Sequence, residues 1–213
     1  MISNYKHIIW DWNGTLFNDV EMSVSIVNNL LIKRNLPPLS FEKYKEIFTF
    51  PVKDYYITAG FDFEKESFEV VGKEWIDEYE RRKNESGLAD SALQLLEKIS
   101  SMNIKQSILS AYSQHTLVEI VEHFGLTKYF SHLVGLDNIY ASSKVMLGKE
   151  LMKKLELKNS EALLIGDTIH DFDVATEIGA DCILLASGHQ NHKNLLQCGV
   201  PIFDSIKDVL VKP

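Results

Sequence analysis

The chain has 213 residues, and its 30 acidic against 22 basic side chains leave a formal net charge of −8 at pH 7. Hydrophobic residues make up 45% and charged residues 24% of the sequence, which is typical of a globular protein and excludes a disordered chain, a collagen or a small disulfide-stapled fold. The acidic excess also argues against nucleic acid as a partner, since broad nucleic-acid binding needs clustered lysine and arginine.

The beginning of the chain and its cysteines indicate the compartment. Residues 1–6 lead into an apolar run without the hydrophobic segment of a signal peptide. No stretch of 18 or more apolar residues occurs, so we expect no membrane partner. Cys182 and Cys198 are too few for a disulfide framework, and Cys182 lies in an apolar run that predicts a buried thiol. We therefore expect a cytoplasmic protein.

The first predicted element is a buried strand over residues 7–10, which ends at Asp11 and meets a tight turn at Asn13 and Gly14. Residues 18–85 contain no convincing buried strand, and apolar positions at helical spacing predict amphipathic helices near 22–32 and 68–79. We interpret residues 18–85 as an inserted helical cap domain.

From residue 91 onward, apolar runs alternate with helical patterns. Strands are predicted at 106–110, 132–136, 162–167 and 182–186, and helices at 91–101, 116–124, 146–155 and 172–178. This alternation predicts a parallel sheet, and continuously apolar strands indicate helices on both of its faces. The expected fold is α/β: a Rossmann-like, three-layer core made of residues 1–17 and 86–213, carrying the α-helical cap.

Polar residues follow three of the predicted strands. Asp11, Ser110 and Asp167 stand at strand ends, and Asp171 follows Asp167 by four residues. Ligands of open parallel sheets bind beyond the carboxyl ends of the strands, so we expect these side chains in one pocket.

The same residues carry a family resemblance. D-W-N-G-T-L-F at residues 11–17 resembles the first motif of the haloacid dehalogenase superfamily, and G-D-T-I-H-D at residues 166–171 resembles its fourth. Ser110 is similar to the second motif and Lys144 to the third, with Lys149 as its rival because the usual proline-flanked lysine form is absent. The chain is identified as a member of that superfamily, in its phosphoglycolate-phosphatase-like branch with a small helical cap.

The resemblance implies a Mg²⁺-dependent phosphatase that hydrolyses a small phosphorylated metabolite through a phosphoaspartyl intermediate. Asp11 would be the nucleophile, and Ser110 and Lys144 would contact the phosphoryl group. The implied metal ligands are Asp11, the backbone carbonyl of Asn13, Asp167 and Asp171. The implied substrate-binding residues are Gly14, Thr15, Ala111 and, in the cap, Lys53 and Tyr55.

Asn13 departs from the family pattern, which has a second aspartate as general acid and base at this position. An amide carries no proton to a leaving group at neutral pH, and general acid–base catalysis is typically worth about 10²–10⁴-fold. Three outcomes stay open: a substrate with a good leaving group such as an acyl or aryl phosphate, a proton carried by His170 or His189, or a long-lived phosphoenzyme.

Other functions also stay open. They are a phosphotransferase similar to phosphoglucomutase, a metal-independent dehalogenase, and a catalytically silent phosphate-binding regulatory module. The oligomeric state is left undetermined.

Overall fold

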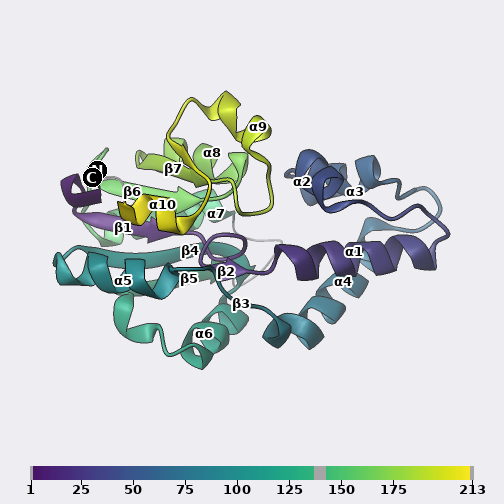
Figure 1. The fold of residues 1–213 in the computed structure, drawn as a ribbon, viewed down its shortest axis with the longest axis horizontal. Helices are drawn as coiled ribbons and strands as arrows, with labels where there is room; N and C mark the ends of the chain where they lie inside the picture. The colour runs from purple at the N-terminus through teal and green to yellow at the C-terminus, as the bar shows by residue number, and fades with distance from the viewer. Residues whose placement is uncertain (1, 137–142, 212–213) are drawn as a thin grey trace.

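The structure is a computed structural model that describes residues 2–136 and 143–211 (Figure 1). Its main sheet is parallel, in the order β5-β4-β1-β6-β7-β8. The strands are β1 (His7–Trp10), β4 (Lys105–Ser113), β5 (His132–Leu136), β6 (Ala162–Gly166), β7 (Asp181–Leu185) and β8 (Ile202–Phe203). The predicted parallel sheet is confirmed, and β8 is an additional edge strand.

Helices cover both faces of this sheet, because alternate residues of each central strand pack into different cores. Ile8 and Trp10 of β1 pack on one face, whereas Ile9 packs on the other. The first face is covered by α5 (Ala92–Ser101), α6 (Gln114–His123) and α10 (Ile206–Val211). The second face is covered by α7 (Lys144–Lys154), α8 (Ile169–Ile178) and the short α9 (His192–Leu195). This confirms the three-layer α/β core.

A separate group of helices lies beside the sheet, at the right of Figure 1. It consists of α1 (Val20–Lys33), α2 (Phe41–Ile47), α3 (Val52–Ala59) and α4 (Phe68–Arg82). We call residues 20–82 the helical unit. It has an apolar cluster of its own, which includes Val27, Leu31 and Tyr56. The two helices predicted here correspond to α1 and α4, whereas α2 and α3 were not predicted.

Two short strands join the helical unit to the sheet. β2 (Phe17–Asn18) and β3 (Gly87–Leu88) pair antiparallel, so the chain enters and leaves the unit at one place. The remaining elements are the 3-10 helices η1 (Ile2–Asn4), η2 (Lys83–Glu85), η3 (Thr127–Tyr129) and η4 (Leu196–Cys198). Within the described part of the chain, no helix is both long enough and apolar enough to cross a membrane.

Candidate active site

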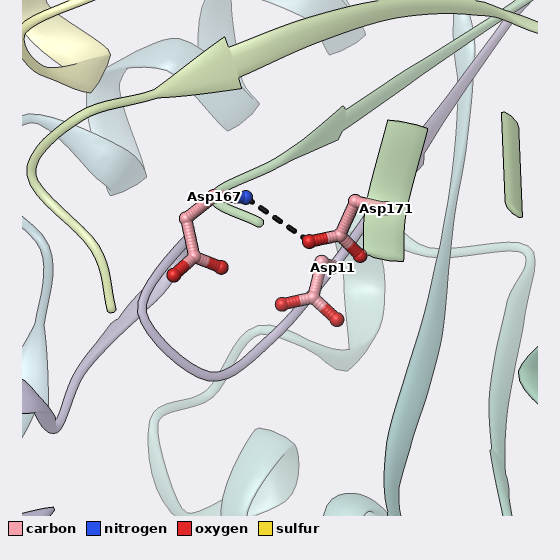
Figure 2. A group of neighbouring side chains, drawn as sticks. All are labelled: Asp11, Asp167 and Asp171. Atoms are coloured by element: carbon pink, nitrogen blue, oxygen red, sulfur yellow. Dashed lines mark hydrogen bonds between the residues drawn. The ribbon is translucent and has the colours of Figure 1, made fainter. Parts of the chain in front are cut away.

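Three buried carboxylates converge where β1 and β6 end (Figure 2). Asp11 directly follows β1, Asp167 follows β6, and Asp171 lies in the first turn of α8. β1 and β6 are hydrogen-bonded neighbours, so their carboxyl ends lie side by side. One carboxylate oxygen from each aspartate lies within 4.8 Å of the other two. The structure thus brings together three of the residues that were expected in one pocket.

Hydrogen bonds hold two of these aspartates in place, Asp171 at the start of α8 and Asp167 between two loops. Thr168 is the N-cap residue, and its side chain and that of Asp171 form a reciprocal capping box. Asp171 Oδ2 accepts hydrogen bonds from the backbone N–H of Thr168 at 3.0 Å and from its hydroxyl at 2.6 Å. Asp167 accepts from the Thr15 hydroxyl at 3.1 Å and from the backbone N–H of His189 at 2.6 Å. Both carboxylates therefore have fixed orientations.

Gly14 allows the turn after β1 to pass directly over Asp167. Its φ is +70°, and a Cβ at this position would lie 2.4 Å from Asp167 Oδ2. A side chain is therefore excluded by backbone conformation and by space together. Gly14 and Thr15 support the site in this way and do not line the cavity described below.

Lys144, the first residue of α7, bridges two of the carboxylates. It is 4% exposed, and its Nζ lies 2.5 Å from Asp11 Oδ1 and 2.5 Å from Asp171 Oδ1. Lys149, the rival lysine, is exposed and pairs with Glu177 at 2.8 Å on the surface. The structure brings Lys144 and not Lys149 to the acidic cluster.

The cluster holds more negative charge than one ammonium group compensates. Burial raises the pKa of Asp11 to about 8, against the opposing effect of Lys144. Burial likewise raises the pKa of Asp167 to about 6. For Asp171 burial is outweighed, because Lys144 and Thr168 hold its pKa below the usual value. An added cation would stabilise the ionised forms of Asp11 and Asp167.

A cavity of 220 Å³ opens beside the cluster, between the sheet and the helical unit. Ser110 and Ala111, at the carboxyl-terminal part of β4, line it, and Ser110 Oγ accepts a hydrogen bond from the Tyr112 backbone N–H at 3.1 Å. Tyr55 lines it from α3. The structure does not bring Lys53 to this cavity, because Lys53 is exposed and lies over the Phe63 ring at 5.9 Å.

The Asn13 side chain belongs to a hydrogen-bond network that sequence reasoning missed. Its Nδ2 donates to Asp19 Oδ2 at 3.0 Å and to the Tyr79 hydroxyl at 2.6 Å. The Tyr79 hydroxyl donates to the same Asp19 oxygen at 2.7 Å, and the Gly14 backbone N–H donates to the other at 2.8 Å. These donors, together with the charge of His189, keep the pKa of Asp19 low although burial opposes this.

His189 completes this network from the loop after β7. Its Nε2 lies 3.4 Å from Asp19 Oδ1, and its Nδ1 is hydrogen-bonded to the Tyr44 hydroxyl at 2.8 Å. Burial disfavours the charged imidazole, but Asp19 outweighs burial and raises the pKa of His189 to about 8. His170 instead lies against the Phe50 ring, 4.7 Å between centroids, and burial lowers its pKa. Of the two candidate histidines, only His189 contacts the Asp19 network.

Comparisons with known proteins show which family and which solved structures the chain resembles. Residues 8–185 match the family model described as haloacid dehalogenase-like hydrolase. A phosphoglycolate phosphatase from Rhodobacter capsulatus is 22% identical, over 86% of this chain and 85% of that protein. Another from Vibrio parahaemolyticus is 23% identical, over 96% of this chain and 94% of that protein. Among solved structures, a haloacid dehalogenase-like family hydrolase from Streptococcus pneumoniae superposes with a TM-score of 0.83, at 19% identity over 99% of this chain and 98% of that chain.

Proposed function

The chain belongs to the haloacid dehalogenase-like hydrolases, and we propose that it is a Mg²⁺-dependent phosphatase acting on a small phosphorylated metabolite. Hydrolysis of phosphoric monoesters is the activity of the curated relatives that it matches over most of its length. The observation that carries the proposal is the group of three buried carboxylates with Lys144, placed at two strand ends and the start of α8 beside a cavity.

The donor set suits Mg²⁺. Carboxylate oxygens of Asp11, Asp167 and Asp171 are hard ligands of the kind this ion prefers. Burial, with a smaller contribution from neighbouring carboxylates, raises the pKa values of Asp11 and Asp167, and a divalent cation would stabilise their ionised forms. We propose these three residues and the backbone carbonyl of Asn13 as the ligands. Bound Mg²⁺ would lower the electrostatic repulsion between the carboxylates and the phosphate dianion.

Asp11 is the proposed nucleophile. One of its oxygens attacks phosphorus, a new O–P bond forms, and the ester P–O bond breaks with its electron pair leaving on the ester oxygen. Lys144 holds the Asp11 carboxylate at 2.5 Å and supplies positive charge beside the transferring group. The Ser110 hydroxyl, whose oxygen already accepts from Tyr112, would donate its hydrogen to a phosphoryl oxygen. Water then attacks the phosphoaspartate, which releases phosphate and restores Asp11.

The helical unit is proposed as a cap that excludes water from the reaction and contacts the part of the substrate beyond the phosphate. It faces the acidic cluster across the cavity, to which it contributes Tyr55. The converging carboxylates favour the metal-dependent reaction over the dehalogenase alternative, in which a lone aspartate attacks carbon. The buried free thiols Cys182 and Cys198 support a reducing compartment such as the cytoplasm.

Phosphate release and metal binding test the proposal separately. We expect release from a panel of phosphate monoesters with MgCl₂, none with EDTA, and none from Asp11→Asn, which lacks the nucleophile. In calorimetric titration, Mg²⁺ should bind the wild-type chain and bind Asp167→Asn at least about tenfold more weakly. Turnover that persists in EDTA, or in Asp11→Asn, would contradict the proposed reaction.

A further inference from the structure

The wall that the helical unit contributes to the cavity is largely aromatic. The helical unit contributes seven aromatic side chains to the lining, namely Tyr44, Phe48, Phe50, Tyr55, Tyr56, Trp75 and Tyr79. Several pack against one another, with Tyr44 and Tyr55 in edge contact at 5.6 Å and Phe48 and Tyr55 at 5.3 Å between centroids. Such walls bind flat, apolar groups by burial and ring stacking.

Among the described residues, this lining has no lysine or arginine other than Lys144 to pair with a negatively charged leaving group. Among the described residues that line the cavity, the basic side chains are Lys144, His170 and His189. Lys144 is engaged by Asp11 and Asp171, and His189 is paired with Asp19. His170 lies against Phe50. A carboxylate such as that of phosphoglycolate would be buried here without a lysine or arginine to balance its charge, which is costly.

Two hydroxyl groups in the lining lack a partner among the described residues. Ser23 of α1 is 1% exposed and Tyr55 of α3 is 2% exposed, and neither Ser23 Oγ nor Tyr55 Oη has a hydrogen bond. Both residues line the cavity. Buried hydroxyls are almost always hydrogen-bonded, so each of these two is available to bond a polar group of a ligand.

Asn13 restricts the leaving group independently of the cavity walls. Its amide donates to Asp19 and Tyr79, and it has no acidic proton to give to a departing oxygen. Without a proton from this position, the ester oxygen leaves most readily as an anion that is stable in itself. A phenol has a pKa of about 10, so a phenolate is a far better leaving group than an aliphatic alkoxide.

We propose that the substrate is the phosphate ester of an aromatic hydroxyl, with an uncharged ring that carries at least one polar substituent. The inference rests on the proposed phosphatase function and narrows its substrate class. Asp11 attacks phosphorus, the bond between phosphorus and the aryl oxygen breaks, and the phenolate leaves with the electron pair and takes a proton from solvent. The cavity of 220 Å³ is smaller than the roughly 300–1,000 Å³ of typical drug-sized sites, which favours a single ring over a nucleotide.

A four-substrate comparison tests the proposal on the full chain with Mg²⁺. Phenyl phosphate combines a ring with a good leaving group, benzyl phosphate keeps the ring with an alkoxide, acetyl phosphate keeps a good leaving group without a ring, and phosphoglycolate has neither feature. We expect kcat/KM for phenyl phosphate to exceed that for benzyl phosphate and phosphoglycolate by about 100-fold or more. We expect KM for phenyl phosphate to lie at least about tenfold below that for acetyl phosphate.

The possible results distinguish a wrong substrate class from a wrong phosphatase function. Phosphoglycolate turned over as efficiently as phenyl phosphate, with dependence on Mg²⁺ and Asp11, would overturn the aryl-phosphate proposal and leave the phosphatase function standing. Benzyl phosphate turned over as fast as phenyl phosphate would overturn it too, since another group would then be protonating the leaving oxygen. No release from any of the four would overturn both the function and the substrate class.

Two variants test the unpartnered hydroxyls. Tyr55→Phe and Ser23→Ala each remove a hydroxyl that has no partner in the protein, so neither loses an internal hydrogen bond. With 2-, 3- and 4-hydroxyphenyl phosphate as probes, we expect each variant to raise KM for at least one isomer about fivefold relative to phenyl phosphate. Tyr129→Phe is the control, because the Tyr129 hydroxyl bonds Glu97 at 3.0 Å outside the lining. If the ratio of KM for each hydroxyphenyl phosphate to KM for phenyl phosphate is unchanged in both test variants, the polar-substituent part of the proposal is overturned.

Discussion

At the scale of single residues, Asn13 and Asp19 depend on each other. The amide of Asn13 donates to Asp19 at 3.0 Å, and Asp19 in turn anchors the Gly14 turn and faces His189. An aspartate at position 13, the usual residue of the family, would bring a second carboxylate into this contact. Compared with an aspartate, the Asn13 amide cannot carry a proton, but it donates a hydrogen bond to the buried Asp19 carboxylate.

Asn13→Asp is therefore expected to destabilise the protein in a pH-dependent way. Two adjacent carboxylates raise the pKa of one of them in the folded state above its unfolded value of about 4. The penalty is absent below that pH, grows as pH rises, and should reach about 2 kcal/mol by pH 8. Urea unfolding at pH 5 and pH 8 measures it. The exchanged pair Asn13→Asp with Asp19→Asn should recover most of the loss, and an equal loss at both pH values would contradict this explanation.

A second prediction at the residue scale concerns Lys144, and Lys149 on the same helix provides the matched control. Lys144→Met leaves buried carboxylates without their cation, so we expect a loss of about 3 kcal/mol or more in unfolding free energy. Added Mg²⁺ should restore part of it, because a bound cation compensates the same charge. Lys149→Met removes an exposed pair and should cost less than about 1 kcal/mol. Thermal unfolding with and without Mg²⁺ measures both losses. Equal losses in the two variants would contradict the assignment of Lys144, rather than Lys149, as the lysine that compensates the acidic cluster.

At the scale of elements, long apolar runs were predictable and short elements were not. β1, β6 and β7 coincide with predicted runs to within a residue, because their apolar stretches are continuous, and the weaker run at 132–136 coincides with β5. β8 has only two residues, and α2 and α3 have seven and eight, too few for a clear period. The acidic cluster followed from strand ends, since parallel topology alone places those ends together.

The Asp19 network was not predictable for a physical reason. Asp19 is the N-cap residue of α1, so it resembles an ordinary helix-start acid, although its side chain makes no capping bond. Its partners Tyr79 and His189 are separated from it by 60 and 170 residues, and only the packing of the helical unit on the sheet joins them. No spacing in the sequence predicts that Asp19 contacts Tyr79 and His189.

The prediction at the scale of elements concerns the pH dependence of stability that His7 in β1 contributes. It is 3% exposed and bonded through Nε2 to Ser107 Oγ at 2.8 Å, and burial lowers its pKa to about 4. The unfolded value is about 6.5, so the unfolded chain binds more protons between these values. Stability contributed by neutral His7 is complete above about pH 6.5 and is lost as pH falls toward 4, by up to about 3 kcal/mol.

The check is the free energy of unfolding between pH 4 and pH 7. The difference between wild type and His7→Gln should shrink as pH falls, since the variant lacks the titrating group. Exposed His115→Gln serves as the control and should run parallel to wild type. A His7→Gln curve parallel to wild type would show that His7 does not carry this dependence.

At the scale of the whole molecule, the cavity exists because two separate parts of the chain meet over the acidic cluster. The helical unit is covalently joined to the core through β2 and β3, and it also docks on the loop after β7 (Figure 1). In that docking, Lys45 Nζ donates to the Ala186 carbonyl at 2.8 Å, Gln190 Nε2 to the Phe48 carbonyl at 2.8 Å, and Asn194 Nδ2 to the Glu46 carbonyl at 2.7 Å. These contacts hold the aromatic wall against the site.

Loosening this docking should open the cavity without touching the acidic cluster. Lys45→Met combined with Asn194→Ala removes one bond from α2 to the loop after β7 and one bond between α2 and α9. We expect faster hydrogen exchange at α2 amides together with a KM raised about three- to tenfold. Lys43→Met is the control, because Lys43 lies on the same helix, is exposed and pairs only with Glu46 of α2 at 3.2 Å among the contacts described. A KM that rises while exchange at α2 stays unchanged would mean that Lys45 or Asn194 acts on the substrate itself. A kcat that falls with KM unchanged would place the docking in a later step, such as exclusion of water during turnover of the phosphoenzyme.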